Sequence, residues 1–236
     1  MAFHQLAGRG DLLLIADHAS NHVPADIALG IDPRLLDTHI AVDLGVDALA
    51  RALNRRIGCA CILGGISRLV VDLNRERDAP HVIPTASDGH VIPGNAIDHD
   101  ARRHRIARFW TPYHDRIAAE IAAHRPCLLI SLHSFTPRLE TAPDAARPWQ
   151  IGVLYNDDER AARIAIPLLA AEGVVVGDQL PYSGKLLNAT MNLHGEANGI
   201  PYLGLEVRQD LIANTAGIGL WAERLARLIE SVASKL

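Results

Sequence analysis

The stretch LLLIADHASNHVP, Leu12 to Pro24, joins a block of apolar residues directly to a group of polar side chains and ends at a proline. An unbroken run of leucine and isoleucine, without polar alternation, is typical of a strand that is covered on both faces of a sheet. The polar side chains Asp17, His18, Asn21 and His22 would then lie where this strand ends. The stretch therefore predicts a buried strand that delivers polar groups to a site.

Apolar runs of the same kind recur along the chain, with helical patterns between them. We expect strands at 11–16, 59–63, 68–73, 127–132, 150–155 and 202–208. We expect helices at 34–57, closed by Gly58, at 97–124, bent near Pro112, at 157–172, disturbed by Pro167, and at 218–235. This alternation predicts a three-layer α/β fold, in which a mostly parallel sheet has helices on both faces.

Composition and charge bound the possible functions. The 236 residues, with 49% hydrophobic and 21% charged side chains, suit a single domain over 1–236. The net charge of −4 supplies no basic field that would attract nucleic acid or an anionic membrane. The N-terminus lacks a signal-like pattern, and the three cysteines form no CxxC pair, so we expect a cytoplasmic protein without a disulfide framework. The proline-containing stretches 79–95 and 136–148 are expected to be long loops near a site.

Chemically active side chains follow several of the predicted strands. His18 follows LLLIAD, His133 lies in SLHSFTP, and Glu206 lies late in YLGLEVRQD, while SRLVVDLNRERD carries Asp72 and Arg75. In α/β sheets, ligands bind beyond the carboxyl ends of the strands, so we expect these groups to share one site. A single histidine beside an apolar run is more often a hydrogen-bonded core residue, but two in this position favour a metal site.

These residue types suit a hydrolytic zinc site. Such a site needs about three protein ligands, usually histidine and carboxylate, and an open position for water. His18 and His133 would supply imidazoles, and Glu206 would take the proton from water and pass it to the leaving nitrogen. Arg75 would clamp a substrate carboxylate with two parallel hydrogen bonds, although an ion pair with Glu76 or Asp78 is an equal alternative.

Other catalytic classes fit less well. No G-x-S-x-G elbow occurs, which makes a serine hydrolase the weaker interpretation. Neither a phosphate-binding P-loop nor a dinucleotide fingerprint is present.

Four motifs together resemble the N-formylglutamate amidohydrolase family. They are DHASNHVP, SRLVVDLNRERD, SLHSF and GIPYLGLEVRQDLI, which occur in this order between residues 17 and 212. SLHSF and LEVRQD are also similar to motifs of the zinc carboxypeptidases. The resemblance implies a phosphorylase/hydrolase-like α/β sheet and a zinc hydrolase, with His18 and His133 as ligands and Glu206 as the base.

The resemblance leaves the third metal ligand open. Carboxypeptidases carry HxxE at the first motif, whereas this chain has Asn21 where that glutamate would be. Similarity to zinc peptidoglycan amidases implies Asp43, on the first long helix, as the carboxylate ligand of a single zinc ion. Asp47, Asp72 and Asp17 are alternatives. Besides Arg75, the residues assigned to substrate binding are Asn21, Arg208 and His194.

For function, the resemblance implies hydrolysis of N-formyl-L-glutamate to formate and glutamate, the last step of one histidine degradation route. Because the short HASN form differs from family members associated with that pathway, another small N-acyl amino acid remains a possible substrate. The alternatives are a zinc peptidase or peptidoglycan amidase, and a metal-independent amino-acid-binding relative. Retention of both histidines and of Glu206 makes the last of these the weakest.

Overall fold

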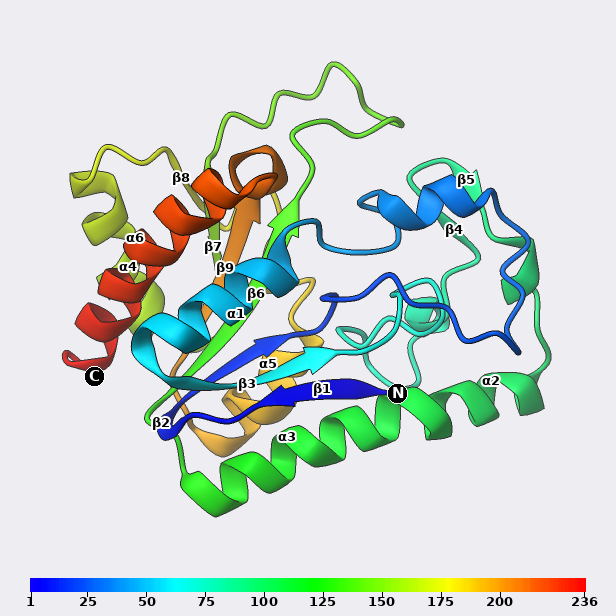
Figure 1. Ribbon diagram of the computed structural model, residues 1–236, viewed down its shortest axis with the longest axis horizontal. Coiled ribbons are helices and arrows are strands. Elements are labelled where there is room, and N and C mark those ends of the chain that lie inside the picture. The colour runs from blue at the N-terminus through cyan, green and yellow to red at the C-terminus, as the bar shows by residue number, and fades with distance from the viewer.

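The computed structural model describes residues 1–236 and contains a seven-stranded sheet (Figure 1). In spatial order the strands are β1 (Phe3–Leu6), β3 (Cys59–Gly64), β2 (Arg9–Ala16), β6 (Leu128–Phe135), β9 (Tyr202–Arg208), β7 (Ile151–Leu154) and β8 (Val176–Asp178). Neighbouring strands are parallel except β1 against β3 and β7 against β9. The predicted mostly parallel sheet is therefore confirmed.

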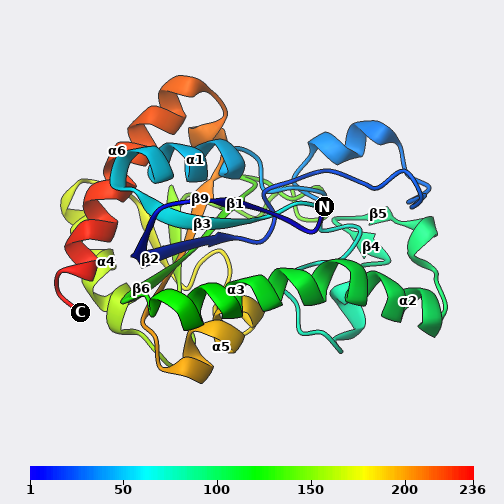
Figure 2. The ribbon, with the colours of Figure 1, turned by 60° about the horizontal axis from the view of Figure 1, so that its bottom comes forward.

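Helices cover both faces of the sheet, as expected. Figure 2 shows α1 (Val46–Ile57) and α6 (Thr215–Ala233) on one side, and α3 (Thr111–His124) and α5 (Ala189–His194) on the other. Helix α4 (Arg160–Ala171) packs against α6 and β9. No helix combines the length and the apolar character that crossing a membrane requires.

Several short elements complete the chain. They are the hairpin strands β4 (Ala86–Ser87) and β5 (His90–Val91), helix α2 (His99–Arg105), a π-helical turn (Ile106–Trp110), and 3-10 turns at Pro33–Asp37, Pro80–Val82, Pro93–Asn95, Glu196–Asn198 and Gln209–Ile212.

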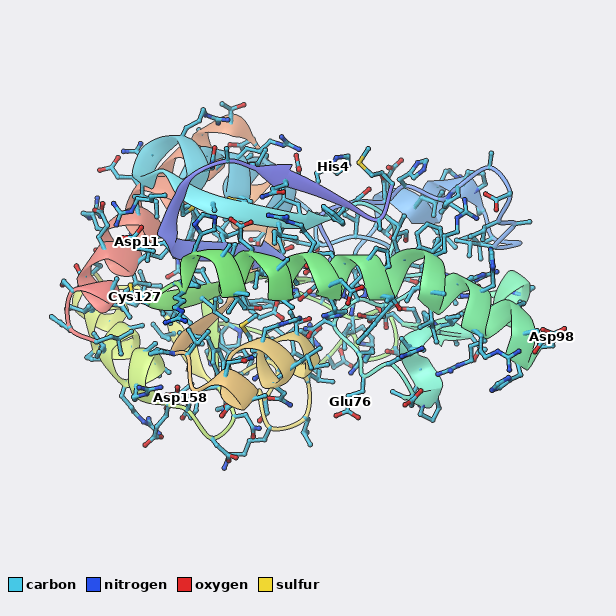
Figure 3. All side chains as sticks on the ribbon, turned by 90° about the horizontal axis from the view of Figure 1, so that it is seen from below. His4, Asp11, Glu76, Asp98, Cys127 and Asp158 are labelled. Atoms are coloured by element: carbon cyan, nitrogen blue, oxygen red, sulfur yellow. The ribbon has the colours of Figure 1, made fainter.

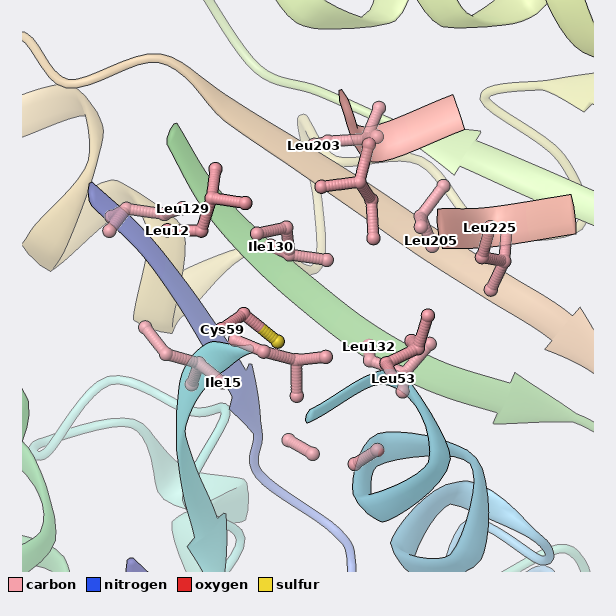
Figure 4. Close-up of a cluster of buried hydrophobic side chains, with 14 of the residues drawn as sticks. Leu12, Ile15, Leu53, Cys59, Leu129, Ile130, Leu132, Leu203, Leu205 and Leu225 are labelled. Atoms are coloured by element: carbon pink, nitrogen blue, oxygen red, sulfur yellow. The ribbon is translucent and has the colours of Figure 1, made fainter. Parts of the chain in front are cut away.

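The apolar runs form the core between the layers. Every residue of β6 is buried, and so are residues 12–16 of β2. Helix α1 buries Val46, Leu49, Ala50, Leu53 and Ile57, the spacing of one helical face. Figure 4 shows part of this core, with leucines of β2, β6 and β9 together with Leu53 of α1 and Leu225 of α6. Strands covered on both faces need continuous apolar runs, which explains why β2, β6 and β9 were predictable.

The long helix predicted at 34–57 is wrong over its first half. Asp32 caps the turn by accepting a hydrogen bond from the backbone N–H of Arg34, but the helical turn ends after Asp37, where Thr38 is extended. Helix α1 begins only after Gly45, whose φ of 83° lies in the left-handed region that glycine tolerates best. Asp43 therefore lies in the connection before α1 and not on the helix.

The predicted strand at 68–73 is also wrong. These residues form turns off the sheet, and Leu69, Val70 and Val71 pack into two smaller apolar clusters. Their burial explains the apolar run, because a buried loop and a buried strand have the same composition. Asn95 donates to the carbonyl of Leu69 and helps to satisfy this buried backbone.

The helix predicted at 97–124 consists of α2, the π-helical turn and α3 in direct succession, and Figure 3 shows them running along one side of the molecule. Pro112 lies in the first turn of α3, directly after the π-helical turn, so its missing N–H interrupts the hydrogen bonding of this continuous helical stretch. Pro167 lies inside α4 without ending it.

Gly64 allows the ends of β3 and β2 to approach each other. A Cβ atom at Gly64 would lie 2.1 Å from the carbonyl oxygen of Asp17. Gly64→Ala should therefore displace the Asp17 backbone and lower the free energy of unfolding by about 1–3 kcal/mol, measured by urea denaturation. Gly219→Ala in α6 is the control, because no atom lies within 4 Å of its Cβ position, and it should be neutral or stabilising. Equal stability of Gly64→Ala and the parent would contradict this close contact.

Candidate metal centre

The sheet brings the two predicted histidines together. His18 follows the end of β2, and His133 lies in the adjacent strand β6. Their ring centroids are 5.0 Å apart. Strand β9 continues the order, and its Glu206 is in register with His133. Parallel neighbours thus place three chemically active side chains at one edge of the sheet.

Asp43 completes a compact group with the two imidazoles. Its Oδ2 lies 3.4 Å from Nδ1 of His18 and 2.8 Å from Nδ1 of His133. All three side chains are buried, and their possible ligand atoms lie within 4.8 Å of one another. The backbone N–H of Asp43 donates to the carbonyl of His18, which ties the connection before α1 to the end of β2. Two imidazoles and a carboxylate form a donor set that suits zinc.

The outer nitrogen of each imidazole faces another carboxylate. Nε2 of His18 lies 2.7 Å from Oδ1 of Asp72, and Nε2 of His133 lies 3.2 Å from Oδ2 of Asp17. Histidines that bind metals usually direct their second ring nitrogen toward such a partner, which sets the tautomer and the ring orientation. Asp72 and Asp17 therefore occupy supporting positions and not the space between the two Nδ1 atoms.

Two further observations favour Asp43 among the proposed carboxylates. Asp47 lies on α1 and pairs with Arg51, away from the cluster. Nδ1 of His18 is buried without a hydrogen-bond partner. Unpaired buried polar atoms are uncommon, and a cation between His18, Asp43 and His133 would satisfy this one. The residues present therefore fit a metal ion.

The buried charges shift the pKa values within the cluster. Burial disfavours protonation of His133, yet contacts with Asp17 and Asp43 outweigh it and raise its pKa well above the ordinary value. Burial alone would raise the pKa of Asp43, but His18 and His133 hold it below its ordinary value. The surroundings thus keep the carboxylate ionised and favour positive charge at its side.

Arg68 is a residue of the site that the sequence prediction missed. Its guanidinium lies 3.3 Å from Asp43 and 3.0 Å from Asp72, so it bridges the inner and the supporting carboxylates. Arg68 lies four residues before Asp72, and this spacing is only a weak sequence signal for an ion pair between them. Its role depends on Asp43, 25 residues away in the sequence.

Glu206 has a raised pKa, whereas the pKa values of the other buried carboxyl groups of the site, Asp17, Asp43 and Asp72, are lowered. It is buried, and its Oε2 has no hydrogen-bond partner. Burial raises the pKa of Glu206 to about 7, against the opposing charge of His133. Together with His18, Asp43 and His133 it lines a cavity of about 660 Å³. A carboxyl group of this kind can exchange a proton near neutral pH.

Arg75 lies in the same cavity, with one third of its side chain exposed. Its nearest carboxylate is Asp72, at 3.7 Å, so the predicted alternative pairs with Glu76 or Asp78 are wrong. Its backbone carbonyl accepts a hydrogen bond from the indole N–H of Trp110, in the π-helical turn. The backbone of Arg75 is thus fixed by Trp110, and its guanidinium makes only the long ion pair with Asp72.

Asn21 and Arg208, which were predicted to bind substrate, do not line the cavity. The exposed side chain of Asn21 donates to Asp37, because the loop after β2 turns outward there. Arg208 pairs with Asp210 and also donates to the carbonyl of Pro148, which holds its guanidinium on the β7 side of the sheet.

His194, also predicted to bind substrate, does not line the cavity. It is buried on α5, where its Nε2 lies 2.9 Å from Nδ1 of His114, and His114 in turn contacts the carbonyl of Leu73. Burial lowers the pKa of His194 to about 4, so the imidazole is neutral in the folded protein. This pair joins α3 and α5 beneath the site.

Comparisons with known proteins agree on one family. Residues 10–213 match the family model described as N-formylglutamate amidohydrolase. The chain is 30% identical over 165 residues to the N-formylglutamate deformylase of Pseudomonas aeruginosa, an alignment that covers 56% of this chain and 62% of that protein. The match thus spans less than two thirds of the relative's length.

Solved structures extend the likeness to the whole chain. The gene product Atu2144 of Agrobacterium tumefaciens has a TM-score of 0.93 and 30% identity, covering 99% of this chain and 95% of its own. An N-formylglutamate amidohydrolase of Ralstonia eutropha has a TM-score of 0.72 and 20% identity, covering 100% and 98% of the two chains. Because its sequence identity is only 20%, the likeness to the Ralstonia eutropha structure shows a shared fold alone.

Asp72 should support metal binding through His18 without touching the ion. Asp72→Asn should lower the affinity for Zn²⁺ about 10–100-fold, measured by competition with a chromophoric chelator. Asp47→Asn is the matched control, because Asp47 pairs with Arg51 at the surface of α1, and it should bind zinc like the parent. An unchanged affinity in Asp72→Asn would show that the outer contact does not act on the metal.

Proposed function

The chain belongs to the N-formylglutamate amidohydrolase family, and from this premise we propose that it is a zinc-dependent hydrolase of the amide bond in small N-acyl amino acids, such as N-formyl-L-glutamate. The proposal rests mainly on one observation. Nδ1 of His18, Nδ1 of His133 and Oδ2 of Asp43 converge in a cavity that also contains the unpaired carboxyl group of Glu206.

His18, Asp43 and His133 would hold a single zinc ion. When bound, zinc polarises the scissile carbonyl and lowers the pKa of the attacking water. The protein contributes the orientation of the donors. Asp72 and Asp17 face the outer nitrogens of the imidazoles, and Arg68 balances the charge of Asp43 and Asp72.

Glu206 would act as the general base and then as the general acid. Its buried Oε2 makes no competing hydrogen bond, so it is available to accept a proton from water. A pKa of about 7 allows the same carboxyl group to pass the proton to the leaving nitrogen near neutral pH. One residue would thus complete both proton transfers of amide hydrolysis.

Arg75 would bind the carboxylate of the amino-acid part. Arg68 is already engaged by Asp43 and Asp72, whereas the closest carboxylate to Arg75 is 3.7 Å away. A planar guanidinium matches a carboxylate with two parallel hydrogen bonds, and an ammonium group does not.

A zinc peptidase or peptidoglycan amidase would use the same zinc and Glu206 chemistry on longer substrates.

Removing the acidity of Glu206 should stop turnover without emptying the metal site. Glu206→Gln should lower kcat by about two to four orders of magnitude, the usual contribution of a positioned acid-base group. Elemental analysis should still find one zinc per chain. Glu223→Gln on the exposed face of α6 is the control and should turn over normally.

Two other results for Glu206→Gln would contradict this role. Loss of zinc together with activity would make Glu206 a metal ligand. Early thermal unfolding with nearly normal turnover per folded molecule would make it a structural residue.

Replacing Arg75 should affect acidic substrates selectively. Arg75→Lys should raise KM for N-formylglutamate by about tenfold or more, because the bidentate contact is lost, and should change KM for the α-amide analogue much less. Steady-state kinetics on both compounds test this, with the exposed Arg77→Lys as the control. Equal effects on the acid and the amide would mean that Arg75 does not bind the carboxylate.

A further inference from the structure

The cavity is larger than N-formylglutamate requires. Its volume is about 660 Å³. That volume lies within the range of about 300–1,000 Å³ found for sites that enclose drug-sized ligands, whereas N-formylglutamate has only about a dozen non-hydrogen atoms. A substrate of that size, placed between Arg75 and the metal ligands, would leave a large part of the cavity unfilled.

The unfilled part is bounded by what we call the distal wall. Its members are Thr85, Ala86, Ser87, Asp88, Leu139 and Thr141, which all line the cavity. They come from the β4–β5 hairpin and from the long loop after β6. Figures 1 and 2 both show this hairpin away from the seven-stranded sheet, on the side toward which β2 and β3 run.

A buried carboxylate holds the distal wall in place. Asp88, with a φ of 40°, accepts hydrogen bonds from the backbone N–H groups of Glu140 and Thr141 and from the hydroxyl of Thr141. Its Oδ2 also lies 2.9 Å from Nε2 of His39. Only 4% of the Asp88 side chain is exposed. Asp88 thus joins three chain segments, and these contacts fix the shape of the distal wall.

The distal wall is matched to an uncharged group. Apart from Asp88, its side chains are small, apolar or hydroxylic, and it contains no lysine or arginine. The carboxylate of Asp88 is saturated by its own partners, and it engages the neighbouring His39. A second substrate carboxylate, such as the γ-carboxylate of glutamate, would find no lysine or arginine among these residues.

The position of Arg75 indicates which part of the substrate reaches the distal wall. Arg75 approaches the metal ligands from the side of His18, through Asp72. Leu139 and Thr141 instead follow the strand that carries His133. In an N-acyl amino acid the acyl chain leaves the scissile carbonyl on the side away from the carboxylate, so it would extend toward the wall.

We propose that the distal wall is a subsite for an uncharged acyl chain of several carbons, so that the substrates are N-acyl amino acids with acyl groups longer than formyl. This inference rests on the proposed function, because it assumes that the amide bond is cleaved beside Glu206 and that Arg75 holds the carboxylate.

The test compares N-formyl-, N-acetyl-, N-butyryl- and N-hexanoylglutamate on the zinc-loaded protein. We expect kcat/KM to rise about two- to fourfold for each added methylene, the effect of burying it partly or fully. Ser87→Phe, which fills the subsite, should lower kcat/KM for the hexanoyl compound about tenfold or more and leave the formyl compound within about twofold. Val91→Phe is the control, because Val91 is on the same hairpin but 68% exposed and outside the cavity. It should change neither value.

Other outcomes separate this inference from the proposed function. Fastest cleavage of the formyl compound, with a decline for longer chains, would overturn the subsite and leave the function standing. If nothing is cleaved, the function fails, and calorimetric binding to the Glu206→Gln variant decides the inference. Tighter binding of longer acyl chains there supports the subsite, and equal binding overturns it. A higher kcat/KM for N-formyl amino acids with long side chains than for those with short ones would also overturn the subsite, because the wall would then bind the side chain.

Discussion

The site depends on the balance of buried charge around Asp43. Three buried carboxylates, of Asp17, Asp43 and Asp72, surround two imidazoles where β2 and β6 end. Burying such charges is costly unless each finds an opposite partner. Arg68 balances part of this charge, and a divalent cation beside Nδ1 of His18 would balance more. The parallel register of β2, β6 and β9 makes this concentration of charge possible, because it brings side chains from distant parts of the sequence to one edge.

The fold was predictable where the local sequence carries the information. Continuous apolar runs marked β2, β3, β6, β7 and β9, because strands covered on both faces have no polar alternation. The same composition led to a wrong strand prediction at 68–73, where the apolar residues belong to a buried loop outside the sheet. Gly45, with its left-handed backbone, explains why α1 begins only at Val46. The helical periodicity of the sequence continues across Gly45, so the prediction placed the start of the helix too early. The short edge strands β1 and β8 and the short helix α5 depend on tertiary packing and carry little local pattern.

The site was predictable to the extent that it follows strands. His18, His133 and Glu206 come at or near the ends of buried runs, and the sheet order brings them together. Asp43 reaches the cluster from a connection and not from the expected helix. Substrate contacts were harder to predict, because the neighbours of a polar side chain are set by tertiary contacts. Arg208 and Asn21 find carboxylates at the surface, and His194 pairs with His114, 80 residues away.

The central claim is that His18, Asp43 and His133 hold the catalytic metal, with Glu206 left free. Anomalous diffraction at the zinc edge from crystals of the zinc-loaded protein tests it most directly. We expect one peak per chain, about 2.0–2.2 Å from Nδ1 of His18, Nδ1 of His133 and a carboxylate oxygen of Asp43, with Glu206 not coordinated. A peak coordinated by Asp72, Asp17 or Glu206 in place of Asp43, or no peak in the cavity, would contradict it.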